Sequence, residues 1–274
     1  MRPAGVAARW ALLAPMVLLS AAPIAWMAIA ALRPGDQPLA AGSPWWPDQP
    51  TLANVVGLFG DPQFGRWVSN TALVTAGTLL IGLVTSLLAG YALAYLDVPY
   101  SRSLVLVFFA TYLLPQAVLF IPLLRMVSRL HLLNSPAALV LTYPSMVIPF
   151  GTWVVWSFFR RLPPDLVDSA RADGAGVYAT IVHVLLPVVW PALATVGLYA
   201  VAVVLNDYLY TTTFIQEPSG QTITGALGAL ITADIDNPGR SFAAALLAAA
   251  PLAVVCAFFA DAFARGLSTG IIEQ

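Results

Sequence analysis

Six charged side chains lie within fourteen residues of a chain in which only 9% of residues are charged. They are Arg160, Arg161, Asp165, Asp168, Arg171 and Asp173. Carboxylates and guanidinium groups form strong hydrogen bonds and ion pairs, so this segment is suited to binding another protein. A run of charges is also typical of a solvated loop. Composition alone therefore leaves both interpretations open.

Residue types that carry catalysis or bind metals are scarce. The two histidines, His131 and His183, show no metal-ligand spacing, and the single cysteine, Cys256, lies in an apolar run that predicts a small buried residue. The sequence contains no G-x-x-x-x-G-K-[ST] phosphate loop. Its net charge of −1 gives no sign of the basic surface that nucleic acid requires. We expect no catalytic residue, metal, bound cofactor or nucleic-acid partner.

The composition predicts an all-α integral membrane protein. Of the 274 residues, 59% are hydrophobic and the mean hydropathy is +0.83, whereas soluble domains have about 45–50% apolar and about 25% charged residues. Six intervals provide the roughly 20 apolar residues that cross a bilayer. The predicted transmembrane helices are 10–32, 69–95, 103–124, 137–159, 188–213 and 242–264. Six spans place both termini on the same side of the membrane.

The arginines predict which side that is. With the N-terminus in the cytoplasm, seven arginines lie inside and five outside, and the short N-terminal segment and the 160–187 loop favour this orientation. The first apolar run has 23 residues, from Trp10 to Leu32, whereas a signal peptide has about 7–15. We expect a retained anchor, although Ala28-Ile29-Ala30 is similar to a cleavage site.

Three segments are predicted along the chain. Residues 1–68 hold the first span and an outer loop rich in proline and glycine, residues 69–266 form the transmembrane core, and residues 267–274 form a cytoplasmic tail. No internal repeat is found.

The 160–187 loop is predicted to form a helix-turn-helix at the membrane surface. Pro163-Pro164 ends the fourth span and allows a new helix to begin. Negative charge in its first turn, from Asp165 and Asp168, is favourable by about 0.3–1 kcal/mol. Gly174 stops this helix or permits a left-handed turn.

The second helix of that unit is expected from about 176 to 183. Pro187 and Pro191 then re-aim the chain into the fifth span. The result is an acidic surface of small residues, a shape that suits a groove on a partner.

The run DSARADGA, residues 168–175, followed by Leu186-Pro187 and Pro191, resembles the EAA loop of the permeases of binding-protein-dependent ABC importers. That pattern is roughly E-A-A-x-x-D-G-A-(x)n-I-x-L-P-x-x-x-P. The resemblance implies that the loop docks on an ATPase subunit. The implied docking residues are Asp165, Asp168, Ser169, Ala170, Arg171, Asp173, Gly174 and Ala175. Asp168 replaces the family's Glu and Ser169 its first Ala, which shortens the reach of the carboxylate.

Three further stretches, TLANVVGLF, NDYLY and GLSTG, resemble the sugar-importer branch and its maltose-type permease G subunit. Leu205 replaces the tryptophan that precedes the second stretch in that branch. The resemblance covers the chain from about residue 51 to its end, and it implies that Gly266, Leu267 and Gly270 reach towards the ATPase.

A member of this family forms the translocation pathway with a second permease subunit. The resemblance implies homodimeric or heterodimeric ATPase partners that bind ATP and magnesium, an extracytoplasmic solute-binding protein, and a place in the bacterial cytoplasmic membrane. Sugars or oligosaccharides are the first expected substrates, and glycerophosphodiesters or amino sugars the alternative.

Polar residues inside spans are candidates for lining that pathway. A charge at bilayer depth costs about 2.5–3.5 kcal/mol, so Asp207 is expected to face a cavity or a neighbouring helix. Pro115, between Tyr112 and Gln116, frees a backbone carbonyl and can kink the third span. The candidate pathway residues are Tyr112, Gln116, Asn206, Asp207 and Tyr208. A purely structural pairing of Asp207 with another helix is the open alternative.

Two other classes of protein are alternatives. A secondary transporter commonly has repeated halves, and a membrane enzyme needs a nucleophile–histidine pair or a metal cluster within its spans. The sequence shows none of these features.

Overall fold

The computed structural model describes residues 3–35, 44–163, 165–233 and 238–269, with the backbone alone for 3–12, 232–233, 255 and 258–269. All secondary structure in these ranges is helical. The elements are α1 (Pro3–Ala31), α2 (Ala53–Phe59), α3 (Pro62–Tyr95), α4 (Ser101–Tyr112), α5 (Gln116–Arg129), α6 (Pro136–Thr142), α7 (Pro144–Phe159), α8 (Asp165–Ala172), α9 (Val177–Ala179), the π-helix η1 (Thr180–Leu185), α10 (Leu186–Asn206), α11 (Leu209–Phe214), the 3₁₀-helix η2 (Pro218–Gly220), α12 (Ile223–Ala233) and α13 (Pro238–Thr269).

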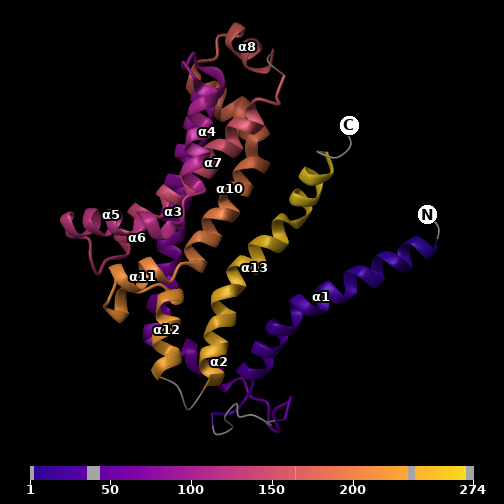
Figure 1. Ribbon diagram of the computed structural model, residues 1–274, viewed down its shortest axis with the longest axis vertical. Coiled ribbons are helices and arrows are strands. Elements are labelled where there is room, and N and C mark those ends of the chain that lie inside the picture. Colours follow the sequence, from indigo (N-terminus) through magenta and orange to yellow (C-terminus); the bar gives the residue numbers. More distant parts are fainter. Residues whose placement is uncertain (1–2, 36–43, 164, 234–237, 270–274) are drawn as a thin grey trace.

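The helices form a long bundle with two distinct ends (Figure 1). α8 lies at one end, and α2 and α12 lie at the other, while α5 and α11 project from one side between them. α3, α7 and α10 pack against one another in the centre, and α1 contacts α13. The N-terminal end of α1 and the C-terminal end of α13 both point from the α2 end of the bundle towards the α8 end (Figure 1).

Four segments are long and apolar enough to cross a membrane among the described residues, and the bent pair α4–α5 would be a fifth. The four are Leu13–Ala31, Pro62–Tyr95, Pro136–Phe159 and Val177–Asn206. α13 contains a shorter apolar stretch, Pro238–Val254. These segments confirm an all-α fold with several apolar spans.

The predicted third span, 103–124, is not one helix. α4 ends at Tyr112, α5 begins at Gln116, and the two axes are bent by 91°. Pro115 has no N–H to continue the α4 hydrogen bonds, and it disfavours helical backbone at the residue before it. The sequence predicted a kink here, whereas the structure has a complete break that directs α5 out to one side of the bundle (Figure 1).

The predicted fifth span, 188–213, also differs. Its helix ends at Asn206, and Asp207 is extended at φ −79° and ψ 125°. At its other end the predicted short helix 176–183 is not separate, because α9, η1 and α10 form one continuous apolar segment from Val177 to Asn206. The wide π-helical turn lies just before Pro187, which cannot donate a backbone hydrogen bond, and such turns accommodate a missing donor.

Small residues allow the central helices to approach closely. A Cβ on Gly90 would lie 2.6 Å from a Val155 side-chain carbon, and one on Gly82 would lie 3.0 Å from Val147. Small residues at contacts between membrane helices let their backbones pack closely. The spacing of glycines along α3 therefore sets its packing against α7.

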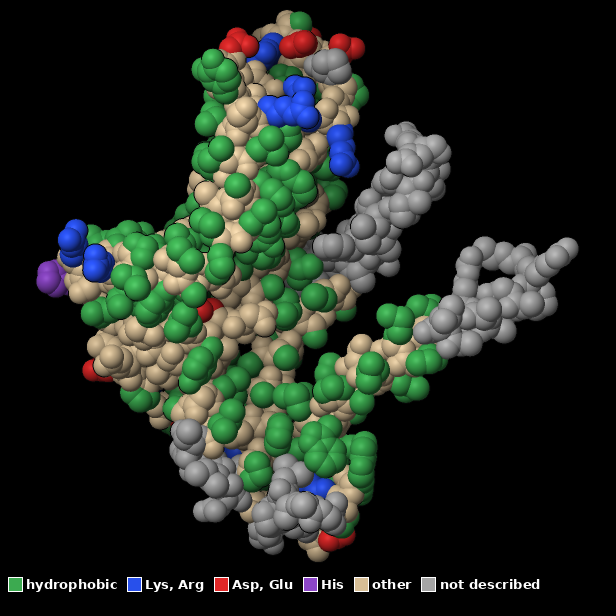
Figure 2. All heavy atoms as spheres, viewed as in Figure 1, with side chains coloured by type: hydrophobic (Ala, Val, Ile, Leu, Met, Phe, Trp, Pro, Cys, Tyr) green, Lys and Arg blue, Asp and Glu red, His purple; other side chains and the backbone are tan. Residues whose placement is uncertain are grey.

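The surface of the bundle is rich in exposed apolar side chains (Figure 2). Leu19 on α1 is 79% exposed and Leu80 on α3 is 67% exposed. Soluble monomers rarely expose large contiguous apolar patches, so lipid or a partner helix must cover this surface. Cys256 is exposed as well, which corrects the prediction that it is buried: its side chain lies on the outer surface of α13.

Candidate functional site

The charged segment forms an eight-residue helix, α8, that projects from one end of the bundle (Figures 1 and 2). Val167 is 1% exposed and anchors the helix, whereas Asp168 and Ser169 are exposed. Arg171 and Asp168 approach to 3.9 Å at the surface, a pairing that stabilises little in water. The exposed polar side chains of α8, namely Asp165, Asp168, Ser169 and Arg171, are therefore accessible to another molecule.

Gly174 closes α8 in the way that its residue type predicts. Its φ is +83°, and no atom lies within 4 Å of where its Cβ would be. The N–H of Ala175 donates to the carbonyl of Ala170 at 2.9 Å, and the N–H of Gly174 donates to the carbonyl of Arg171 at 3.0 Å. This pair of bonds is a Schellman motif. The backbone conformation, not lack of space, requires glycine here.

A second candidate region lies where two spans are interrupted. The break between α4 and α5 and the break between α10 and α11 are adjacent, because the Tyr210 hydroxyl donates to the carbonyl of Gln116 at 2.7 Å. Non-helical backbone at membrane depth is stable only when protein buries it or when it lines a water-filled cavity. Broken helices of this kind form substrate sites in many transporters.

Asp207 is the centre of a buried hydrogen-bond network at the second break. It is 8% exposed and accepts a hydrogen bond from the Tyr143 hydroxyl at 2.7 Å. The backbone N–H groups of Thr211 and Tyr210 also donate to its carboxylate, at 3.0 and 3.3 Å. Asp207 thus caps α11 and ties it to Tyr143, where α7 begins. This geometry favours the structural alternative for Asp207.

The other four candidate pathway residues are more accessible. Gln116 and Asn206 are exposed, and the Asn206 side chain donates to the carbonyl of Ala202 at 2.9 Å. Tyr208 is 54% exposed, and its ring lies against Gly228. Tyr112 is half-buried among other aromatic rings.

Sequence reasoning missed the aromatic cluster around Tyr112. Its ring centroid lies 5.2 Å from Phe150 and 5.6 Å from Tyr199, and Phe109 lies 4.6 Å from Trp153. α4, α7 and α10 contribute these rings. The residues are up to 90 positions apart in sequence, so only the tertiary packing brings them together.

The network around Asp207 leads to a stability prediction. Asp207→Ala removes a helix cap and leaves the Tyr143 hydroxyl without its carboxylate partner, so we expect the free energy of unfolding to fall by about 2–4 kcal/mol. The neighbouring Asn206→Ala removes one exposed hydrogen bond and should change stability by less than about 0.5 kcal/mol. Unfolding of both variants in detergent, followed by circular dichroism, tests this difference. Equal stability of the two variants would contradict the capping role.

The C-terminal candidates are only partly described. Gly266 and Leu267 belong to the backbone of α13, and Gly270 lies outside the described residues. Pro164, which was expected to help begin α8, is also outside them. Within the described ranges, no three His, Cys, Asp or Glu side chains lie close enough together to hold a metal ion.

Over the described residues the secondary structure is all helical, with several apolar spans, two interrupted helices and a polar helix that projects at one end, and this arrangement is that of a polytopic membrane protein. Residues 82–269, more than half of the chain, match the family described as binding-protein-dependent transport system inner membrane component. The chain belongs to this family, whose members are the non-catalytic permease subunits of ABC importers.

Three relatives are similar over most of their length. A sulfoquinovosyl glycerol permease of Agrobacterium fabrum is 28% identical, over 90% of this chain and 87% of that protein. A diacetylchitobiose permease of Streptomyces coelicolor is 27% identical, over 90% of this chain and 82% of that protein. A trehalose/maltose permease of Thermococcus litoralis is 25% identical, over 94% of this chain and 93% of that protein.

The fold is also similar to a solved structure. A chain of a bacterial ABC transporter involved in alginate import superimposes with a TM-score of 0.76, covering 93% of this chain and 94% of that one at 17% identity. A second structure of an alginate transporter, in complex with an alginate-bound periplasmic protein, has a TM-score of 0.66 at 16% identity, covering 94% and 96%. Both likenesses concern the fold.

Proposed function

We propose that this chain is a permease subunit of an ATP-driven importer and that it forms, with a second permease, the pathway for a sugar or an oligosaccharide. The three relatives named above support a saccharide, because each is named for the transport of a sugar or a sugar glycoside. Glycerophosphodiesters or amino sugars are the second candidates, and the diacetylchitobiose permease supports the amino sugars. Membership of the family sets aside the secondary transporter and the membrane enzyme.

The observation that carries this proposal is the exposed, polar α8 at the end of a lipid-compatible bundle. We assign it the coupling role: Asp168, Ser169 and their neighbours dock in a groove of an ATPase subunit. ATP and magnesium bind to that partner. The shorter Asp168 in place of glutamate leaves a carboxylate available for a basic group there.

α8 is connected through η1 to a helix of the transmembrane bundle. α8 contacts η1, and η1 continues as α10 to the break at Asn206. A push on α8 by the closing ATPases would therefore shift α10 as a unit. Differential affinity of the ATPases for the two positions of α8 is enough to switch the pathway between inward-facing and outward-facing states.

The topology that fits this role has six spans, with α4–α5 as the third and α13 as the sixth. The α8 end and both termini then lie in the cytoplasm of a bacterial cell, and the 267–274 tail lies near the ATPases. The α2 and α12 end faces outwards and receives solute from a binding protein. Of the candidate pathway residues, Gln116, Asn206 and Tyr208 have accessible polar groups beside the two breaks.

Uptake by intact cells tests the proposal. Cells that express this chain with its partner permease, ATPase and binding protein should accumulate a labelled oligosaccharide. Replacing the phosphate-loop lysine of the ATPase should abolish uptake, and so should removal of the binding protein. Uptake that continues without ATP hydrolysis would contradict the assignment. Binding of labelled sugars and glycerophosphodiesters to the purified binding protein identifies the substrate class.

A further inference from the structure

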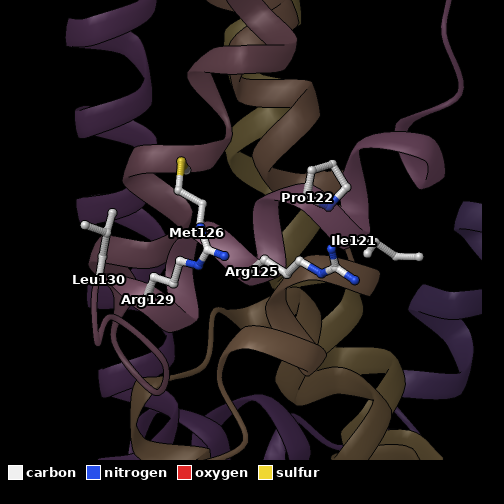
Figure 3. A pocket seen from close by; sticks show the side chains of 6 residues that line it. All are labelled: Ile121, Pro122, Arg125, Met126, Arg129 and Leu130. Carbon is white, nitrogen blue, oxygen red and sulfur yellow. The ribbon is translucent and has the colours of Figure 1, made fainter.

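One face of α5 combines two arginines with apolar side chains around a hollow (Figure 3). The lining residues are Ile121, Pro122, Arg125, Met126, Arg129 and Leu130. The spacing i, i+1, i+4, i+5, i+8, i+9 places all six on one side of the helix. Arg125 and Arg129, one turn apart, are exposed, and neither guanidinium has a hydrogen-bond or ion-pair partner among the described residues.

The opposite face of α5 holds the helix against the protein. Val127 is fully buried. The ring of Phe120 stacks on Phe214 with centroids 6.2 Å apart, and it meets the edge of Tyr210 at 5.5 Å. The face with the two arginines therefore points away from the bundle.

The orientation and the contacts of α5 place it near a membrane interface. Its 91° bend from α4 directs it nearly parallel to the membrane plane if α4 follows the membrane normal. Beyond α5, the Asn134 side chain accepts a hydrogen bond from the N–H of Gln216 at 2.7 Å. Two residues further along, the Pro218 carbonyl accepts one from the Trp67 indole at 2.7 Å. Trp67 is buried in the first two turns of α3, so these contacts tie the segment that follows α5 to the α2 end of the bundle.

We propose that this face of α5 binds an anionic phospholipid. The phosphate lies between Arg125 and Arg129, and an acyl chain covers Ile121, Pro122 and Met126. An amphipathic helix in the interface plane, with arginine beside apolar residues, is suited to anionic lipid. A saccharide fits poorly, because the four other lining side chains are apolar and offer no group that hydrogen-bonds to hydroxyls.

Lipid titration of the full-length chain tests this site. The delipidated protein in neutral detergent is titrated with phosphatidylglycerol or phosphatidylcholine, and native mass spectrometry counts the bound lipids. We expect phosphatidylglycerol to bind more tightly than phosphatidylcholine. The Arg125→Gln/Arg129→Gln variant should weaken phosphatidylglycerol binding about 30-fold at low salt, the factor expected for two basic groups at an anionic surface.

Two control variants separate this site from general effects of charge and folding. Arg125→Lys/Arg129→Lys keeps both charges and should retain most of the affinity. Arg66→Gln removes another exposed arginine, one that belongs to α3 and not to the α5 face, and should leave the affinity unchanged. Equal phosphatidylglycerol affinity in the wild type and the double glutamine variant would overturn the proposal. Displacement of the lipid by inorganic phosphate alone, or by an oligogalacturonate, would overturn it in favour of a free anion or an acidic saccharide.

Discussion

Gly151→Ala is expected to destabilise the transmembrane bundle by about 1–3 kcal/mol, the usual cost of overpacking a core. An added Cβ would lie 2.8 Å from a Val196 methyl group and 2.9 Å from the Ser86 Cβ, and it would meet the Ser86 hydroxyl more closely still. α3, α7 and α10 meet at this glycine, and Val196 is fully buried. The bundle has no space there for a methyl group.

Gly197→Ala is the matched control. Gly197 also lies within a central helix, α10, but the nearest atom to its added Cβ is a Leu79 methyl at 3.6 Å. Alanine is a better helix former than glycine by about 1 kcal/mol, so this variant should be neutral or more stable. Thermal unfolding of both variants in detergent measures the difference. A shift of the unfolding temperature that has the same sign and size in both variants would show that Gly151 does not constrain the packing.

Gly174→Val should uncouple ATP hydrolysis from transport while the chain still folds and inserts. A left-handed conformation costs an L-residue roughly 1–2 kcal/mol, and it is least tolerated by β-branched side chains. That strain lowers the equilibrium constant for the correctly closed loop, relative to its other conformations, about five- to thirtyfold. We expect transport to fall by up to the same factor, because α8 then presents its docking surface in the required orientation for a smaller share of the time.

Gly176→Val is the control for this prediction. Gly176 has φ −70° and ψ 170°, a conformation that any residue adopts, and it also has no atom within 4 Å of an added Cβ. This variant should transport at the wild-type rate. Uptake per ATP hydrolysed, measured in proteoliposomes with the partner subunits, compares the two. If uptake per ATP hydrolysed is the same in Gly174→Val and Gly176→Val, the closed form of the loop is not needed for coupling.

Local signals predicted the parts of this molecule that depend on neighbouring residues. Long apolar intervals predicted the helices, and the acidic start and Gly174 predicted α8 and the turn that closes it. Proline at position 115 predicted a kink, but the size of the bend depends on how α5 packs on α11. A periodic pattern does not contain that information.

The contacts between distant segments could not be predicted in this way. Tyr143 and Asp207 are 64 positions apart, and their hydrogen bond forms only because α7 and α10 pack together. The sequence therefore indicated that a charge at Asp207 is costly within the membrane, but it did not indicate that Tyr143 is its hydrogen-bond partner. The face of α5 was missed because its two arginines look like ordinary loop residues when a straight span is expected.

Cross-linking from α8 tests the central claim, that this helix docks on an ATPase, most directly. Cys256 is first replaced by serine, because it is the one native cysteine and is exposed. Ser169→Cys then places a thiol on α8, and Ser103→Cys places one on an exposed site in the first turn of α4 at the same end of the bundle. With the co-expressed ATPase and a short thiol-to-amine cross-linker, we predict a product from the Ser169→Cys variant whose yield changes with ATP, and only background from the Ser103→Cys variant. Background from both variants, in a complex that still transports, would contradict the account.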